Sequence, residues 1–239
     1  MENKFPGKDI SDSDLKDKFP LVSSKNTKKI VKISKEISFG TNDVPIMAGP
    51  NTLENKDLMF KCCELFEKKN IKILRGGIYK PLTFPYRSDK YFELGDKGIR
   101  ILEEIKKNFD VLIVSEIMEA EKIPLMLDYV DIFQIGARNM QNYPLITNVA
   151  KTKKPVILST GMSNLANIED AVEVFKKNDN KNLILLHCLS AYPANKNEMN
   201  LKAILTLKRN FNVPVGLSDH FPSEEISLMS IGLGANIIE

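Results

Sequence analysis

The two histidines of the chain are the residues whose type and position most clearly suggest chemistry. His187 follows the apolar run Leu-Ile-Leu-Leu, and His220 ends the segment Val-Gly-Leu-Ser-Asp-His. Each lies at the end of a segment expected to be a buried strand. The carboxyl ends of the strands of a parallel α/β barrel open onto one face, so two imidazoles there could hold one divalent metal ion. The alternative is that each histidine is hydrogen-bonded at the barrel mouth without a ligand.

Three cations follow two other predicted strands. Arg75 and Lys80 come after the second, and Arg138 comes after the fourth. Arginine forks bind phosphate through two parallel hydrogen bonds, and lysine adds a point charge or a proton. Neighbouring glycines let backbone N–H groups approach an anion closely. Any one of these cations could be an ordinary solvated loop residue, but together on one face they predict a phosphorylated substrate.

Eight apolar, β-branched segments must position these residues, and each is continuous, as in strands buried on both faces. They are residues 44–48, 71–74, 111–114, 130–135, 155–158, 183–186, 214–217 and 235–238. Helical patterns separate them, for example at 58–69, at 98–107, at 168–177 behind a capping Asn164, and from Pro222 onward. This alternation predicts a (β/α)8 TIM barrel of eight parallel strands, with a doubly wound open sheet as the competitor.

The chain ends at Glu239, where the eighth predicted strand ends, so we expect a barrel that lacks its eighth helix and is truncated at the carboxyl terminus. Residues 1–43 are expected to be a polar N-terminal leader with one short strand near 29–33. Residues 44–239 would form the barrel domain. Because one side of such a barrel is uncovered, we also expect a homo-oligomer.

Composition narrows the partners and the compartment. The net charge of +3 comes without a basic stripe, which argues against nucleic-acid binding. No apolar stretch is long enough for a signal or a membrane span. The three cysteines, Cys62, Cys63 and Cys188, do not form a disulfide framework. We therefore expect a cytoplasmic protein that binds neither membrane nor nucleic acid.

Several motifs resemble known enzymes. The segments Ile-Met-Ala-Gly-Pro-Asn at 46–51, Leu-Arg-Gly-Gly-Ile-Tyr-Lys-Pro at 74–81 and Gln-Ile-Gly-Ala-Arg-Asn at 134–139 resemble the short, barrel-only 3-deoxy-heptulosonate-phosphate synthases. Residues 142–146, 154–162, 185–193 and 215–220 resemble sialic acid synthases. Both families belong to one superfamily that condenses phosphoenolpyruvate with an aldose on a barrel of this kind. The resemblance covers about residues 44–239.

Departures from the heptulosonate pattern indicate the branch. Leu82 stands where that family has an arginine for the phosphate of its acceptor sugar, and Ser159 and Thr160 replace its Lys-Arg pair, as in sialate synthases. Asn51 replaces a metal-binding cysteine, as in metal-independent octulosonate-phosphate enzymes. The resemblance therefore implies an unphosphorylated acceptor, such as the N-acyl hexosamine N-acetylmannosamine.

The resemblance also implies a transferase and its site. The product would be a 3-deoxy-2-keto acid of the sialic (nonulosonic) type, released with inorganic phosphate. A divalent ion, Mn²⁺ or similar, is expected on His187 and His220, both also predicted to be catalytic, while Glu239 matches a metal-binding carboxylate of the heptulosonate branch. Lys80 and Glu116 would move protons. The predicted substrate-binding residues are Asn51, Arg75, Lys80, Gly136, Ala137, Arg138, Ser159, Thr160, Ser190, Ser218 and Asp219.

Two alternatives remain open. One is 3-deoxy-7-phosphoheptulonate synthase activity with erythrose 4-phosphate, which the motifs of the first half of the chain favour. The other is a barrel remnant without activity, which the expected loss of the eighth helix favours.

Overall fold

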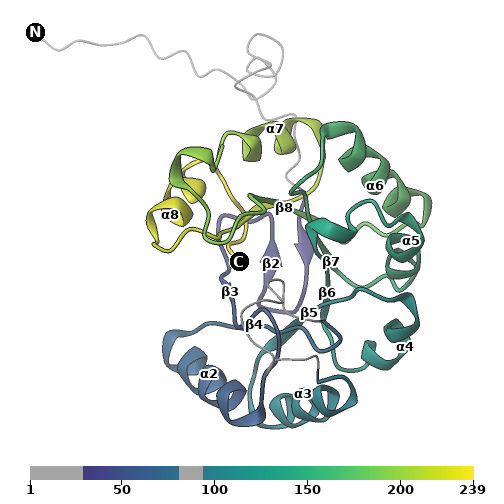
Figure 1. Cartoon of the computed structure of the whole chain (residues 1–239), viewed down its shortest axis with the longest axis vertical. Helices are drawn as coiled ribbons and strands as arrows, with labels where there is room; N and C mark the ends of the chain where they lie inside the picture. The colour runs from purple at the N-terminus through teal and green to yellow at the C-terminus, as the bar shows by residue number, and fades with distance from the viewer. Residues whose placement is uncertain (1–28, 81–93) are drawn as a thin grey trace, which may run out of the picture.

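A computed structural model describes residues 29–80 and 94–239. Its central feature is a seven-stranded, all-parallel sheet in the order β3-β4-β5-β6-β7-β8-β9, curled into a ring (Figure 1). The strands are Met47–Ala48, Ile73–Arg75, Leu112–Glu116, Ile132–Ile135, Val156–Ser159, Leu183–Cys188 and Val215–Ser218, in the same order.

Residues 236–239 close the ring as its eighth strand position. Ile238 bridges Ile46 on one side and Leu217 on the other, both in parallel. The Met47 amide donates to the Ile238 carbonyl at 2.8 Å, and the Glu239 amide donates to the Leu217 carbonyl at 2.9 Å. The predicted (β/α)8 fold, with its last strand at 235–238, is thereby confirmed.

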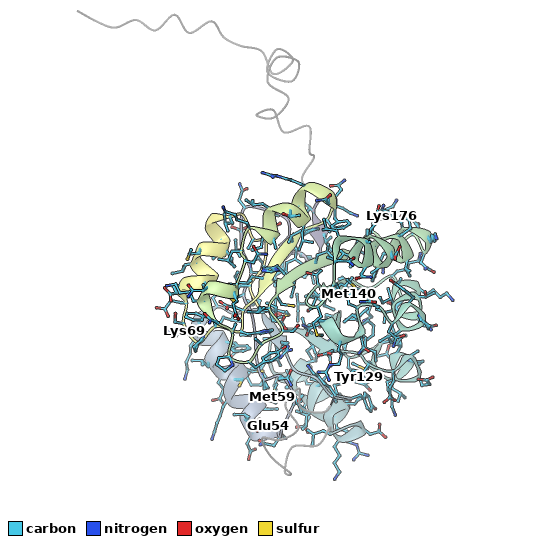
Figure 2. All side chains as sticks on the ribbon, turned by 45° about the horizontal axis from the view of Figure 1, so that its top comes forward. Glu54, Met59, Lys69, Tyr129, Met140 and Lys176 are labelled. Atoms are coloured by element: carbon cyan, nitrogen blue, oxygen red, sulfur yellow. The ribbon has the colours of Figure 1, made fainter. Side chains whose placement is uncertain are left out.

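Helices lie outside the ring and connect successive strands (Figure 1). They are α2 (Lys56–Lys69), α3 (Asp96–Asn108), α4 (Ile123–Met126), α5 (Tyr143–Lys151), α6 (Leu165–Lys177), α7 (Ala203–Asn210) and α8 (Glu225–Gly232), with 3₁₀ turns η2 (Ala120–Lys122), η3 (Ala137–Asn139) and η4 (Lys196–Glu198). Asn164 caps α6 in a capping box with Asn167, as its position before the apolar periodicity predicts. The helix expected from Pro222 begins at Glu225. Lys176 of α6 points outward, away from the ring (Figure 2).

The barrel has two apolar layers because neighbouring residues of a strand face opposite sides. The inner layer includes Ile184 and Leu186 of β8. The outer layer, between strands and helices, includes Leu183 and Leu185 of the same strand. This alternation decides which polar residues can reach the interior of the barrel.

A small antiparallel hairpin joins the inner layer from the amino-terminal end of the strands. It consists of β1 (Val31–Lys32) and β2 (Ser38–Phe39), and Val31 and Phe39 are buried among the interior side chains. The strand expected near residues 29–33 is confirmed as β1. The division at residue 43 between leader and barrel stays a prediction.

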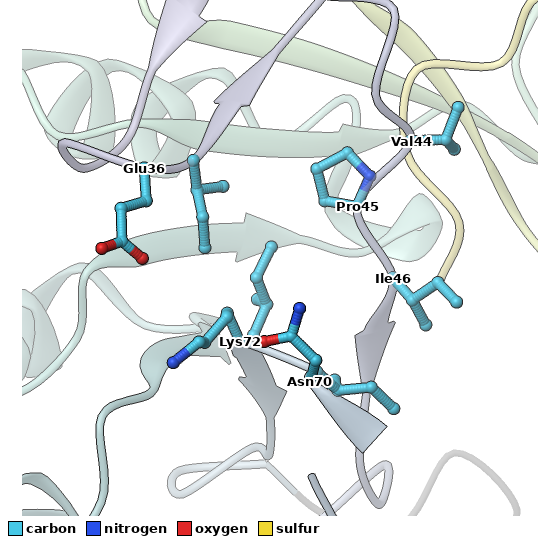
Figure 3. Close-up of a pocket in the computed structure, with 9 residues that line it drawn as sticks. Glu36, Val44, Pro45, Ile46, Asn70 and Lys72 are labelled. Atoms are coloured by element: carbon cyan, nitrogen blue, oxygen red, sulfur yellow. The ribbon is translucent and has the colours of Figure 1, made fainter. Parts of the chain in front are cut away.

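A cleft of about 380 Å³ lies where this hairpin meets the beginnings of β3 and β4. Glu36, Val44 and Pro45 line it together with Asn70 and Lys72 (Figure 3). Its lining residues precede the strands or begin them, so the cleft is at the opposite end of the barrel from the carboxyl ends of the strands. No helix within the described ranges is long and apolar enough to cross a membrane.

The outer face of β3 is uncovered between α8 and α2, where the described chain provides no helix (Figure 1). Ile46, which would be buried in an ordinary parallel barrel, is 53% exposed. Leu65 of α2 and Leu228 of α8 are exposed as well. The homo-oligomer expected from such a surface stays a prediction.

Candidate active site

The base of the site is formed by polar residues at or next to the carboxyl ends of three adjacent strands. Arg75 ends β4, Glu116 ends β5, and Gln134 pairs in register with Glu116 from β6. Arg75 Nε lies 3.3 Å from Gln134 Oε1, and Arg75 Nη2 lies 3.4 Å from Asn51 Oδ1. Strand alternation turns these side chains into the barrel, so residues distant in sequence meet at its mouth.

Gly49 allows the loop after β3 to approach β4. Its φ of 136° is a left-handed conformation that favours glycine. A Cβ at this position would also collide with the Arg75 carbonyl oxygen. The glycine therefore brings Asn51 within reach of the Arg75 guanidinium.

Lys80 and Glu116 form a buried ion pair, with side chains 2% and 4% exposed. Lys80 Nζ also donates to Asn51 Oδ1 at 2.6 Å. Burial lowers the pKa of Lys80, with Arg75 and Arg138 adding to the effect and Glu116 opposing it. Glu116 Oε1 has no hydrogen-bond partner among the described residues. The pair could therefore pass a proton more readily than solvated side chains of the same types.

Glycine at position 136 leaves room for this pair. A Cβ there would collide with Glu116 Oε1 and would lie 3.0 Å from Glu116 Cδ. Ala137 and the exposed Arg138 follow in η3, and Arg138 is near enough to influence the pKa of Lys80. The three predicted cations Arg75, Lys80 and Arg138 thus lie around one region, and Arg75 and Lys80 both contact Asn51 at its base.

Glu239 is buried next to the same cluster. Its Oε1 accepts from Arg75 Nε at 2.8 Å and from Gln134 Nε2 at 2.7 Å. Burial alone would raise the pKa of this carboxyl, but Arg75, Gln134 and the Ser218 hydroxyl together hold it below its usual range. Oε2 has no hydrogen-bond partner within the described chain, although Ser218 is near enough to stabilise the charge. Glu239 is therefore a carboxylate with one oxygen still available.

His220 lies at the mouth, next to Ser218. Its Nδ1 is 2.6 Å from the Leu189 carbonyl oxygen, and its Nε2 is 3.1 Å from Ser218 Oγ. A carbonyl oxygen can only accept, so we assign the proton to Nδ1, which leaves a lone pair on Nε2. Ser218 thus lies beside both the His220 lone pair and the Glu239 carboxylate.

His187 occupies a different layer. In β8 the outward residues Leu183 and Leu185 share the parity of His187, and its Nε2 lies 2.7 Å from the Met199 carbonyl oxygen, just before α7. Burial lowers the pKa of His187, and the Met199 contact partly opposes this. The two histidines contact different carbonyl groups, His187 that of Met199 and His220 that of Leu189. His187 as a catalytic residue and metal ligand stays a prediction, and its position on the outer side of β8 argues against it.

The mouths of β7 and β8 meet at Gly161. A Cβ at Gly161 would lie 2.8 Å from Cys188 Sγ and 3.2 Å from the Ala137 Cβ, and it would also crowd Ser190 Oγ. Ser159 and Thr160 are buried at the end of β7. The predicted residues Ala137, Ser159, Thr160 and Ser190 therefore line neighbouring parts of one rim.

Asp219 is directed to α8 rather than to the base of the site. Its carboxylate accepts from Ser227 Oγ at 2.6 Å and from the Phe221 amide at 2.9 Å. These contacts fix the turn that carries His220, so Asp219 as a substrate-binding residue stays a prediction. Leu82, on which the acceptor assignment depends, lies outside the described residues.

Sequence reasoning missed two residues of the site, Gln134 and Tyr192. Gln134 holds both Arg75 and Glu239, and its signal was a polar side chain inside a segment otherwise typical of a buried strand. The Tyr192 ring lies over the His220 imidazole, with centroids 4.2 Å apart. Nothing in the sequence alone indicates this contact, because the two residues come from different loops.

The described residues supply some, but not all, of the ligands that a divalent metal ion would need. Among residues 29–80 and 94–239, no three His, Cys, Asp or Glu side chains gather closely enough to hold one by themselves. His220 Nε2 nevertheless contacts Ser218 Oγ, and the Glu239 carboxylate lies near the same serine. The Leu189 carbonyl holds the other nitrogen of His220, which is the arrangement common behind metal-binding histidines. These two residues fit a divalent ion whose other ligands would be water and substrate.

Comparisons with known proteins identify the family of the chain. Residues 84–239 match the NeuB family. A pseudaminic acid synthase of Campylobacter jejuni is 37% identical over 174 residues, which cover 70% of this chain and 49% of the relative. A phospho-2-dehydro-3-deoxyheptonate aldolase of Thermotoga maritima is 29% identical over 185 residues, which cover 75% of this chain and 53% of the relative.

A solved structure of a related enzyme has a similar fold. The N-acetylneuraminic acid (sialic acid) synthetase of Leptospira borgpetersenii superposes with a TM-score of 0.76 at 28% identity, covering 89% of this chain and 77% of that one. The chain spans about half the length of the curated relatives it matches. The predicted superfamily of phosphoenolpyruvate-dependent sugar-condensing enzymes is confirmed, and the chain belongs to the NeuB family.

Proposed function

We propose that this protein condenses phosphoenolpyruvate with an unphosphorylated aldose, an N-acyl hexosamine such as N-acetylmannosamine. The product would be a 3-deoxy-2-keto acid of the nonulosonic type, released with inorganic phosphate. The observation that carries the proposal is the buried cluster of Arg75, Lys80, Glu116 and Glu239 at the barrel mouth, in a chain of the NeuB family. Relatives named pseudaminic acid synthase and sialic acid synthetase support the class of product.

The charges of the cluster suit an anionic enol phosphate. Arg75 presents its guanidinium at the base, and Lys80 lies beside it with Asn51 as a shared partner. Arg75 and Lys80 would hold the phosphate and carboxylate of phosphoenolpyruvate, because charge-assisted hydrogen bonds are strong where water is excluded. Arg138 at the rim would add a third cation.

The reaction forms one carbon–carbon bond and one bond from C2 to a water oxygen, and it breaks the bond from C2 to the phosphate oxygen. The π electrons of phosphoenolpyruvate form the bond from its C3 to the aldehyde carbon, and the aldehyde oxygen takes a proton. Water then adds to C2, the bond from C2 to the phosphate oxygen breaks, and the ketone forms as phosphate leaves. Lys80 has a lowered pKa and pairs with Glu116, so this pair would donate one proton and accept the other.

A divalent ion would fit His220 and Glu239. When bound, such an ion would polarise the aldehyde oxygen as a Lewis acid. Glu239 keeps its negative charge because Arg75 and Gln134 stabilise it, and the Leu189 carbonyl holds Nδ1 of His220, so that Nε2 is the nitrogen directed into the site. Two protein ligands leave coordination positions open for substrate and water. Mn²⁺ and similar ions readily bind oxygen ligands of these kinds.

The proposed choice of acceptor sugar depends on the residue at position 82. Leu82 replaces the arginine that would hold an acceptor phosphate in the heptulosonate branch. The rival is erythrose 4-phosphate, and the heptonate relative from Thermotoga maritima supports it. An apolar side chain cannot compensate a phosphate charge, so we favour the uncharged aldose.

The experiment measures phosphate released from phosphoenolpyruvate with Mn²⁺, with N-acetylmannosamine and erythrose 4-phosphate offered separately. The proposal expects release that depends on the amino sugar. Release only with erythrose 4-phosphate would establish the heptulosonate activity instead. A folded sample that releases none with either sugar, or with a panel of other free N-acyl hexosamines, would support the inactive remnant.

A further inference from the structure

The loop after β8 holds His220 through three separate contacts. Leu189 accepts the imidazole proton at 2.6 Å, and the Ala194 amide donates to the His220 carbonyl at 2.9 Å. Tyr192, between them, lies against the imidazole with ring centroids 4.2 Å apart and planes inclined by 34°. His220 itself lies in the loop after β9, so the loop after β8 fixes the orientation of a residue that belongs to the neighbouring loop.

The three contacts restrict different motions. The Ala194 hydrogen bond fixes the backbone of His220, and the Leu189 hydrogen bond fixes the direction of Nδ1. A single hydrogen bond still permits the ring to tilt about the bond to Leu189. An aromatic ring against its face opposes that tilt, because offset aromatic pairs have a preferred geometry. Only with the tilt restricted does Nε2 stay directed at Ser218, 3.1 Å away.

Tyr192 is 41% exposed, so it contributes little to the apolar core. A half-exposed aromatic side chain on a loop would be an inefficient way to stabilise a barrel. Its contact with an imidazole whose Nε2 faces Ser218, the serine that also stabilises the Glu239 carboxylate, has a more specific consequence. We propose that Tyr192 is a positioning residue, whose ring holds the His220 imidazole in the orientation that directs Nε2 into the site.

The inference rests on the proposed function only where His220 is taken to hold a metal ion. The orientation of the ring is a property of the protein alone, so it can be tested without substrate or metal. A second readout, Mn²⁺ affinity, then tests the ligand role separately.

The chain suits ¹⁵N-histidine NMR because it has two histidines, and a His187→Gln variant assigns the two imidazoles. The variants are Tyr192→Phe, which keeps the ring, and Tyr192→Leu, which removes it. Tyr143→Leu is the matched control, since Tyr143 begins α5 and its hydroxyl reaches Asp170 at 3.4 Å. The measured quantity is the exchange rate of the His220 Nδ1–H proton with water.

We expect exchange about tenfold faster in Tyr192→Leu, the scale of losing one aromatic contact, and near the wild-type rate in the other two variants. An unchanged rate in Tyr192→Leu, or an equal acceleration in Tyr192→Phe, would overturn the inference. Mn²⁺ affinity should fall about tenfold in Tyr192→Leu as the ligand becomes misdirected. Faster exchange with unchanged Mn²⁺ affinity would support the positioning role and refute His220 as the metal ligand.

Discussion

Replacing Glu116 by Gln should strongly destabilise the barrel at neutral pH. The substitution keeps the shape of the side chain but leaves the Lys80 ammonium, 2% exposed, without its counter-ion. Removing one partner of a buried pair costs roughly 3–5 kcal/mol of unfolding free energy. Lys80 can escape part of that cost by losing its proton. For a lysine whose pKa is about 10.4 in the unfolded state, removing the proton at pH 7.5 costs about 4 kcal/mol. The loss of unfolding free energy in the variant cannot exceed this cost.

The loss should shrink as pH rises. In the variant, burial lowers the pKa of Lys80 without Glu116 to oppose it, so the folded state binds fewer protons than the unfolded state below about pH 10.4. Stability of the variant therefore rises with pH and is lost as pH falls. At pH 9.5 the same limit is about 1.2 kcal/mol. We expect a difference from wild type of about 3–4 kcal/mol at pH 7.5 and about 1 kcal/mol at pH 9.5.

Urea unfolding at the two pH values measures this difference. Glu103→Gln is the matched control, because Glu103 pairs with Lys107 on the exposed surface of α3 and should change stability by less than about 0.5 kcal/mol. A Glu116→Gln variant as stable as wild type at pH 7.5 would refute the buried ion pair. A loss that did not depend on pH would refute the explanation through the Lys80 proton.

Two further predictions concern packing and thiols. Gly136→Ala should reduce phosphate release at least about tenfold, because even modest overpacking displaces Glu116, whereas Gly232→Ala, with nothing within 4 Å of its Cβ, should leave it unchanged. A Gly136→Ala enzyme with full activity would contradict the tight fit. Burial raises the pKa of Cys63 and of Cys188 to about 11, so both thiols should react slowly with a thiol reagent at pH 8 and about tenfold faster per pH unit above it. Rapid labelling of both at pH 8 in the folded protein, checked by peptide mass spectrometry, would oppose this.

The fold followed from the sequence because buried parallel strands leave a strong apolar signal. Each of the eight predicted segments lies at a strand position of the ring, including 235–238, which pairs through Ile238. Of the hairpin, only the first strand, β1, was predicted from the sequence. Its interior contacts depend on two residues, Val31 and Phe39, in a segment that is otherwise polar.

The site was harder to predict because the same apolar runs hide which way a side chain points. In β8 the residues of both parities are apolar, so the sequence gives no indication that His187 faces the helices and Cys188 the interior. Lys80 and Glu116 were both proposed, but their pairing depends on a loop reaching back into the barrel. Gln134 and Tyr192 act through contacts between separate loops and strands, which pattern alone does not encode.

The central claim is that the barrel joins phosphoenolpyruvate to a free aldose. The most direct measurement mixes phosphoenolpyruvate carrying ¹³C at C3 with N-acetylmannosamine, Mn²⁺ and the protein, and follows the label by NMR. We predict that the labelled carbon becomes a CH₂ group bonded to the former aldehyde carbon of the sugar, with phosphate released in equal amount. Label appearing in the methyl group of pyruvate, with phosphate released but no carbon–carbon bond formed, would contradict the account.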